Sequence, residues 1–219
     1  GGACNSGGSG GSGIVIVRYP SSYVSGSSSD GTPTGTTFVN GKYGGARNFS
    51  SSSDILSISP ISLSGIDYTI ETWFQYPLAS SSDWNTLTRG DSDHQVIIQR
   101  STMLLGMYDN TGGTGFNSSG FVMSTLSNGW HHLAAVGTGT TTSFYIDGSY
   151  VGSSAKKSSA TIAYIGNYQG GSQQFGTIDE FRIFNLARTA AQIKSDYIQG
   201  ISSNGSVYQQ KTGGGVIKL

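Results

Sequence analysis

From Thr37 onward, short apolar runs alternate with clusters of turn residues, a pattern typical of a two-sheet β-sandwich. The clearest strand spans residues 67–76, where strict alternation separates two faces. One face carries Tyr68, Ile70, Thr72 and Phe74, and the other carries Glu71, Trp73 and Gln75. Further strands are predicted at residues 54–58, 95–100, 103–108, 130–136, 142–147, 161–166 and 177–184.

Two local signals fix a hairpin and a helix. Asp147-Gly148 separates two short apolar runs, and the glycine supplies the positive φ that a tight β-turn needs. Thr189 is suited to cap a helix, with Gln192 completing a capping box and Gly200 ending it. The predicted fold is therefore all-β, a two-sheet antiparallel jelly-roll sandwich with one short C-terminal helix.

Composition changes along the chain divide it into four segments. Residues 1–20 form a glycine-rich segment ending in a short β-branched strand, and residues 21–36 read as a linker. Residues 37–200 form the sandwich, and residues 201–219 form a polar tail whose last residues predict an edge strand. A Gly/Ser tract is disordered on its own, so we expect a second copy of the chain, or other subunits of a surface assembly, to hold it.

Charge is sparse, because charged residues make up 11% of the chain against roughly 25% in average proteins. Twelve basic and twelve acidic residues balance, which argues against nucleic acid or anionic lipid as a partner. Uncharged polar residues suit an extracellular or virion surface. No apolar run approaches the roughly 20 residues of a membrane span. The single cysteine, Cys4, allows neither an intrachain disulfide nor a Cys/His zinc site.

Four segments occur in the order of a known family. They are Tyr68-Thr-Ile-Glu-Thr-Trp-Phe, Gly129-Trp-His-His-Leu-Ala-Ala-Val, Phe144-Tyr-Ile-Asp-Gly and Gly176-Thr-Ile-Asp-Glu-Phe-Arg-Ile-Phe-Asn-Leu-Ala-Arg. Together they resemble the laminin-G-like domain of the concanavalin A-like lectin/glucanase superfamily over residues 37–200. The resemblance implies two curved antiparallel sheets with a rim of loops. The segment ending at residue 20 is similar to the glycine-rich regions of phage tail fibres.

The same superfamily includes glycosidases, which need two carboxylates about 5–5.5 Å or 6.5–9.5 Å apart. The only two glutamates, Glu71 and Glu180, lie on different predicted strands, and the adjacent Asp179 points away from Glu180. His131 and His132 are neighbours on a strand and therefore face opposite sides. We predict no catalytic residue and no enzymatic activity, with a glycoside hydrolase as the least favoured alternative.

The resemblance also implies a structural Ca²⁺, held on the rim by hard oxygen ligands. Calcium takes six to eight such ligands. The candidates are four aspartates, with Asp179 first and Asp91, Asp93 and Asp109 after it. Ordinary hydrogen-bonding turns are the alternative interpretation of the same residues.

Glycan binding requires a flat aromatic ring beside amide or carboxylate groups. Two loops offer this combination, and Trp73 adds a ring if its face is open. The candidates are Trp84, Asn85, Trp73, Asn167, Tyr168 and Gln173. The alternative for each ring is burial against the sandwich.

Two functions remain open. The first is a non-enzymatic structural or adhesion protein that displays a lectin-like jelly roll, assembles through its two tails and binds a cell-surface glycan. The second is a purely structural subunit of a fibre or filament with no ligand.

Overall fold

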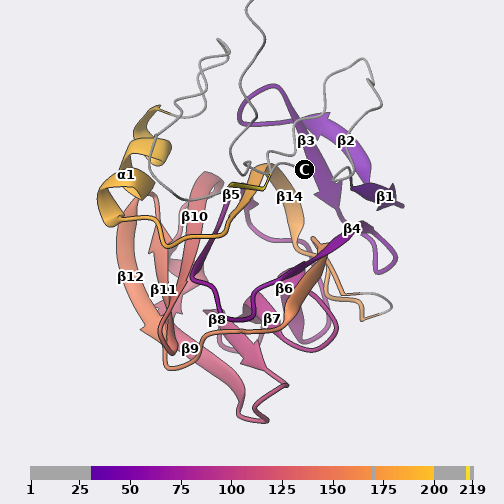
Figure 1. Cartoon of the computed structure of the whole chain (residues 1–219). Coiled ribbons are helices and arrows are strands. Elements are labelled where there is room, and N and C mark those ends of the chain that lie inside the picture. Colours follow the sequence, from indigo (N-terminus) through magenta and orange to yellow (C-terminus); the bar gives the residue numbers. More distant parts are fainter. Residues whose placement is uncertain (1–30, 169–170, 200–215, 218–219) are drawn as a thin grey trace, which may run out of the picture.

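The computed structural model describes residues 31–168, 171–199 and 216–217 of the chain. Two antiparallel sheets face each other, which confirms the predicted sandwich (Figure 1). The seven-stranded sheet has the order β1 (Thr32–Thr34), β4 (Ile55–Ser62), β13 (Thr161–Ile165), β6 (Trp84–Arg89), β7 (His94–Gln99), β8 (Leu104–Asp109) and β9 (Gly115–Val122).

The eight-stranded sheet lies opposite. Its order is β12 (Ser149–Ser154), β11 (Thr141–Ile146), β10 (Gly129–Thr138), β5 (Tyr68–Tyr76), β14 (Gly176–Phe184), β3 (Gly45–Phe49) and β2 (Thr37–Asn40), with β15 (Val216–Ile217) paired to β14. A 3₁₀ turn, η1 (Met123–Thr125), and a helix, α1 (Ala190–Gln199), complete the described elements.

The core fills the space between the sheets, and alternation along each strand decides which side chains enter it. On β5, Tyr68, Ile70 and Phe74 are fully buried in the core, as the sequence pattern predicts. On β10, Leu133 and Ala135 enter the same core. Each fully buried large apolar side chain contributes about 1.5–3 kcal/mol.

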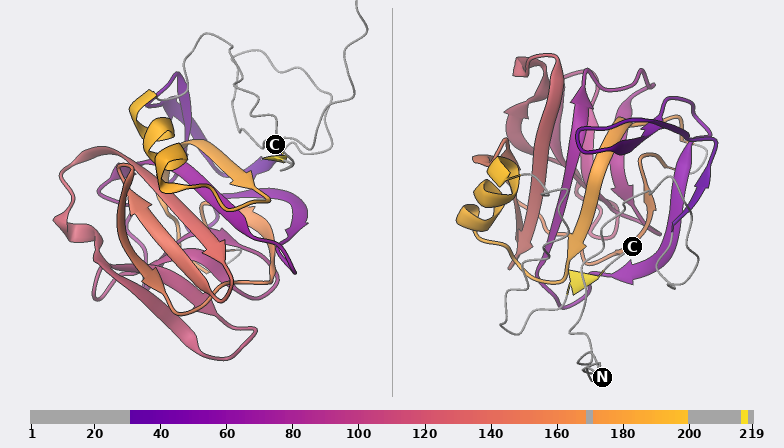
Figure 2. Two further views of the ribbon diagram at one scale, coloured as in Figure 1. Left: turned by 60° about the vertical axis from the view of Figure 1, so that its left-hand side comes forward. Right: turned by 90° about the horizontal axis from the view of Figure 1, so that it is seen from above.

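Helix α1 covers the outer face of the eight-stranded sheet (Figure 2). Its buried residue Ile193 packs against Ala134 and Val136, which point away from the core. The predicted capping box is present, because the Thr189 N–H donates to Gln192 Oε1 at 2.9 Å and the Gln192 N–H donates to Thr189 Oγ1 at 3.3 Å. The helix therefore covers the part of this outer face that lies over β10.

The predicted hairpin between β11 and β12 is confirmed. Asp147 and Gly148 both have positive φ, 51° and 71°, as a tight hairpin turn requires. The Asp147 carboxylate accepts from the His132 backbone N–H at 2.9 Å and lies 2.7 Å from His131 Nδ1. The turn is thereby tied to β10.

Several elements differ from the sequence-based prediction. Residues 32–34, which we placed in a linker, form β1 on the edge of β4. Strands β2, β3, β6 and β9 were not predicted individually, because their short polar runs lack clear alternation. The expectations for residues 1–20, including Cys4, and for most of the C-terminal tail lie outside the described residues. Within the described part, no helix has the length and apolarity to cross a bilayer.

Candidate functional site

Five rings touch one another in a row along one side of the seven-stranded sheet. The ring centres are 5.3 Å apart for Trp84 and Phe116, 5.4 Å for Trp84 and Tyr108, and 5.9 Å for His94 with each of Tyr108 and Tyr168. Four of the rings are half-buried, and His94 lies beneath them at 4% exposure. We call this row the aromatic face.

The aromatic face lies on the outer side of the sheet. In β8, Leu105 enters the core, so Tyr108, three positions later, points outward. Tyr108 pairs directly with His94 on one neighbouring strand and with Phe116 on the other, so the three side chains share this side. Among the described residues no helix covers this sheet, in contrast to the sheet beneath α1.

Two local features of the backbone make the row possible. A register shift between His94 and Ile97 turns His94 outward, whereas regular alternation would put it on the same side as the core residue Val96. Gly106 leaves bare backbone between the rings. A Cβ at this position would lie 2.4 Å from the Asn117 carbonyl oxygen and 2.8 Å from the Phe116 ring.

A directed hydrogen-bond chain runs beneath the rings. The Thr86 hydroxyl donates to Gln173 Oε1 at 2.7 Å, so its oxygen accepts from His94 Nδ1 at 2.9 Å. His94 Nε2 then has a lone pair, which accepts from the Arg89 guanidinium. Burial, with help from the Arg89 charge, lowers the pKa of His94 to about 3, so the ring stays neutral as this chain requires.

Arg89 and Tyr168 close the end of the row. The guanidinium carbon lies 3.7 Å from the centre of the Tyr168 ring, a stacked cation–π contact. At the other end, a shallow depression beside Trp84 is open to solvent and carries mostly polar groups. It is lined by Ser81, Ser82, Asp83, Trp84, Gln99, Arg100 and Ser101. Flat rings and polar groups therefore lie side by side, as a sugar ligand requires.

Three of the predicted glycan residues, Trp84, Tyr168 and Gln173, gather at the aromatic face. The sequence analysis missed Tyr108, Phe116, His94 and Arg89, because their proximity depends on strand register. Trp84 was expected in a loop, but it is the first residue of strand β6.

The two predicted asparagines are buried and serve the loops. Asn85 donates through Nδ2 to the carbonyl oxygens of Ala79 and Gln174. Asn167 accepts through Oδ1 from the Tyr168 and Gln173 backbone N–H groups. Both side chains have no exposed surface. They hold the site in shape and do not face a ligand.

Trp73 does not lie on an open face. Its ring is 4% exposed and is stacked against Tyr197 of α1 with 5.7 Å between ring centres. Tyr43 contacts it edge-on at 5.6 Å, and the Lys42 ammonium lies 4.9 Å from its centre. The helix thus occupies the surface on which a sugar would stack.

The aspartates predicted to hold calcium are instead bound to protein donors. Asp93 Oδ1 accepts from the backbone N–H groups of Asn110 and Thr111, and its Oδ2 accepts from Ser158. Asp91 accepts from the Thr161 hydroxyl at 2.8 Å. Their carboxylates therefore connect loops of the seven-stranded sheet.

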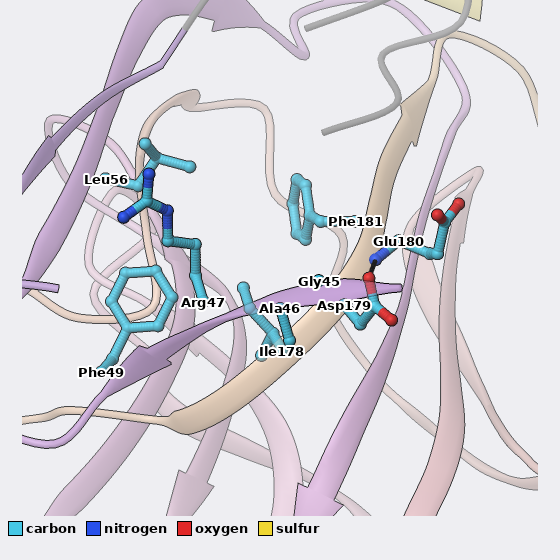
Figure 3. A pocket seen from close by; sticks show the side chains of 9 residues that line it. All are labelled: Gly45, Ala46, Arg47, Phe49, Leu56, Ile178, Asp179, Glu180 and Phe181. Atoms are coloured by element: carbon cyan, nitrogen blue, oxygen red, sulfur yellow. Dashed lines mark hydrogen bonds between the residues drawn. The ribbon is translucent and has the colours of Figure 1, made fainter. Parts of the chain in front are cut away.

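The other two aspartates are used in the same way. Asp109 accepts from the Thr114 hydroxyl at 2.7 Å, and Asp179 accepts from the Tyr43 N–H at 2.8 Å. Asp179 lies on the other sheet, at a narrow hollow between β3 and β14 that has room for about one water molecule (Figure 3). In the described part of the chain, no three His, Cys, Asp or Glu side chains form a group able to hold a metal ion. The calcium site at these aspartates therefore stays a prediction.

Both glutamates belong to a charge cluster beneath α1. Arg188 Nε lies 3.1 Å from Glu71 Oε1, and Arg182 lies 3.6 Å from Glu180. Asp196 of the helix contacts both arginines. Three carboxylates thus share two guanidinium groups, and burial, with the nearby Asp196, raises the pKa of Glu71 to about 8. The cluster ties the helix to the sheet.

The fold is that of a lectin-like jelly-roll sandwich. The chain belongs to the concanavalin A-like lectin/glucanases superfamily, whose sequence profile matches residues 49–194. This confirms the family resemblance seen in the sequence, whereas the similarity of the N-terminal segment to phage tail fibres stays a prediction. No curated protein matches the chain in sequence.

Solved structures of binding domains share the fold. The binding domain of Paraclostridial Mosquitocidal Protein 1 has 20% identity and a TM-score of 0.53, over 77% of this chain and 47% of that one. Domain 4 of AbnA, a GH43 extracellular arabinanase from Geobacillus stearothermophilus solved with arabinotriose, has 18% identity and a TM-score of 0.57, over 75% and 86%.

A third structure is the Botulinum neurotoxin serotype D ligand binding domain, solved with N-acetylneuraminic acid. It has 16% identity and a TM-score of 0.54, over 78% of this chain and 46% of that one. The chain thus spans less than half the length of the two toxin domains. At these identities the likeness concerns the fold.

Proposed function

We propose that this chain is a non-catalytic, extracellular carbohydrate-binding domain whose ligand lies on the aromatic face. The observation that carries the proposal is the row of half-buried rings, Trp84, Tyr108, Phe116 and Tyr168, on a sheet that none of the described helices covers. Aromatic rings stack on the apolar C–H faces of sugars, and neighbouring polar groups bind the hydroxyls.

Two further observations support this proposal. Relatives of the same fold were solved with arabinotriose and with N-acetylneuraminic acid, both of them carbohydrates. The two glutamates, which a two-carboxylate glycosidase would need in an open cleft, are both buried in contact with arginine side chains.

A glycan array followed by titration calorimetry tests the proposal. We expect Trp84→Ala to weaken binding of the best array ligand by about tenfold, because a stacked ring is lost. Tyr150→Ala is the matched control, since Tyr150 is an exposed aromatic residue, 59% accessible, on the eight-stranded sheet. A thermal melt of each variant verifies folding. Absence of any glycan ligand, or equal affinity of the two variants, would refute the proposal.

Assembly into a fibre, a filament or a virion surface remains a prediction, because it rests on residues 1–20 and 201–219. Pairing of β15 with β14 brings residues 216–217 onto the eight-stranded sheet and supports a role for the tail in packing. Light scattering of the full chain and of a variant lacking residues 1–20 measures the oligomeric mass of each protein. A monomeric mass for both proteins would contradict assembly through the N-terminus.

A further inference from the structure

Arg89 brings a positive charge to the aromatic face. Its guanidinium is half-buried at the end of β6, and none of the ion pairs among the described residues involves it. Asp91 and Asp93 lie close enough to act on its charge, but their carboxylates accept hydrogen bonds from Thr161 and from Ser158. No carboxylate of the described chain therefore pairs with this arginine.

The hydrogen-bond chain gives the site a donor character. The Gln173 amide oxygen is occupied by the Thr86 hydroxyl, so the amide nitrogen of Gln173 is the group left for a ligand. At the other end of the chain, Arg89 uses one N–H for His94 and has only donors to offer. A ligand that contacts both residues must supply acceptor atoms.

Tyr168 fixes the orientation of the guanidinium. The Tyr168 ring covers one side of the guanidinium, whose carbon lies 3.7 Å from the ring centre, and the terminal N–H groups that His94 does not use are left for a ligand. A planar guanidinium edge matches the two oxygens of a carboxylate. The neighbouring rings provide surfaces on which the sugar carrying that carboxylate can stack.

We propose that the aromatic face recognises an acidic sugar, a uronic or sialic acid residue, whose carboxylate binds Arg89. This proposal rests on the proposed function and specifies its ligand class. Burial lowers the pKa of Arg89, because the charged guanidinium loses hydration without gaining an ion pair. An incoming carboxylate offsets that loss, which gives acidic sugars an advantage over neutral ones.

The test uses two pairs of ligands. Within each pair the members differ in the presence of the charged group, and the two pairs differ in the sugar that carries it. Trigalacturonic acid is compared with its methyl ester, and sialyllactose with lactose, by titration calorimetry. We expect one acidic member to bind about tenfold or more tightly than its neutral partner. Raising the salt concentration from about 50 to 500 mM weakens only the acidic member. The two pairs separate uronic from sialic acid.

Variants of Arg89 complete the experiment. Arg89→Gln abolishes the preference for the acid, measured as the ratio of the affinities for the acidic and the neutral member of a pair, and Arg89→Lys keeps part of this ratio. Arg47→Gln is the control of equal charge, because Arg47 lies on β3 of the other sheet (Figure 3). Equal binding of acid and ester, or a preference that survives Arg89→Gln, overturns the acidic ligand while glycan binding stands. Absence of binding by every sugar overturns both proposals.

Discussion

The Arg89 guanidinium and the Tyr168 ring are stacked at 3.7 Å, and this contact joins the end of β6 to the loop that follows β13. The same loop is held from below by Asn167, whose amide donates to the Ser52 carbonyl oxygen at 3.0 Å. The stack therefore acts on both the stability of the loop and the shape of the aromatic face.

Removing the Tyr168 ring tests this contact. We expect Tyr168→Ala to lower the free energy of unfolding by about 1 kcal/mol, the usual contribution of a partly exposed cation–π pair. Tyr168→Phe retains the ring and changes the free energy by less than about 0.5 kcal/mol. Urea denaturation followed by tryptophan fluorescence measures both. Equal losses in the two variants would assign the effect to the hydroxyl.

Helix α1 should be a stabilising cover that binding does not need. Ile193 is fully buried against the outer face of β10, so Ile193→Ala should lower the free energy of unfolding by about 2–4 kcal/mol. Ile198 is 67% exposed on the same helix, so Ile198→Ala is the matched control and should change the free energy of unfolding by less than about 0.5 kcal/mol. Similar unfolding midpoints in urea for both variants would show that the helix is not docked as described.

The charge cluster beneath α1 predicts a dependence of stability on pH. Burial raises the pKa of Glu71 to about 8, so the folded state keeps a proton that the unfolded chain loses near its ordinary value. This contribution is fully present at low pH and is lost as the pH rises toward 8. Burial lowers the pKa values of His94 and His132 to about 3, so these rings act in the opposite sense until the unfolded chain has lost their protons, above about pH 7.5. Their effect is common to the wild type and to a Glu71 variant and cancels in the comparison of the two.

Denaturation of the wild type and of Glu71→Gln at several pH values between 6.5 and 8 measures the effect. The wild type should lose up to about 1.4 kcal/mol per pH unit through this group. The glutamine cannot ionise, so that part of the slope disappears in the variant. Parallel curves for the two proteins would show that Glu71 is ionised throughout this range.

The hydrogen bonds of Asp93 predict that the stability of the seven-stranded sheet depends on this carboxylate and does not depend on calcium. Asp93 is 2% exposed and accepts four hydrogen bonds, so Asp93→Ala should lower the free energy of unfolding by about 3 kcal/mol. Excess calcium or EDTA should leave the melting temperature of the wild type unchanged, because protein donors already occupy this carboxylate. Asp83→Ala, an exposed aspartate, is the control. A clear rise in melting temperature with calcium would restore the rim site predicted from the family.

Features set by neighbours in sequence were predictable from the chain alone. The faces of β5 follow from alternation, and the start of α1 follows from the capping pair Thr189 and Gln192, which are three residues apart. The hairpin at Asp147 follows from the conformational freedom of the glycine beside it. In each case the deciding interaction lies within a few residues.

Features set by strand register were not predictable. His94 reaches Tyr108 because of an irregular pairing between β7 and β8, and the Phe116 ring fits because Gly106 has no side chain. Strand β9, rich in Gly, Asn and Ser, carries no periodic signal that would have placed Phe116. Alternation did place Trp73 opposite the core, but it says nothing of a helix that arrives from the far end of the domain to cover it.

The two outer surfaces of the sandwich differ in how far their side chains are tied to folding. Beneath α1, ion pairs and the buried Ile193 leave little freedom for substitution without loss of folding. Across the domain, Trp84 and its neighbouring rings lie outside the core between the sheets. Ligand preference can thus be redesigned, or can diverge among relatives, by exchanging side chains on one surface while the other preserves the scaffold.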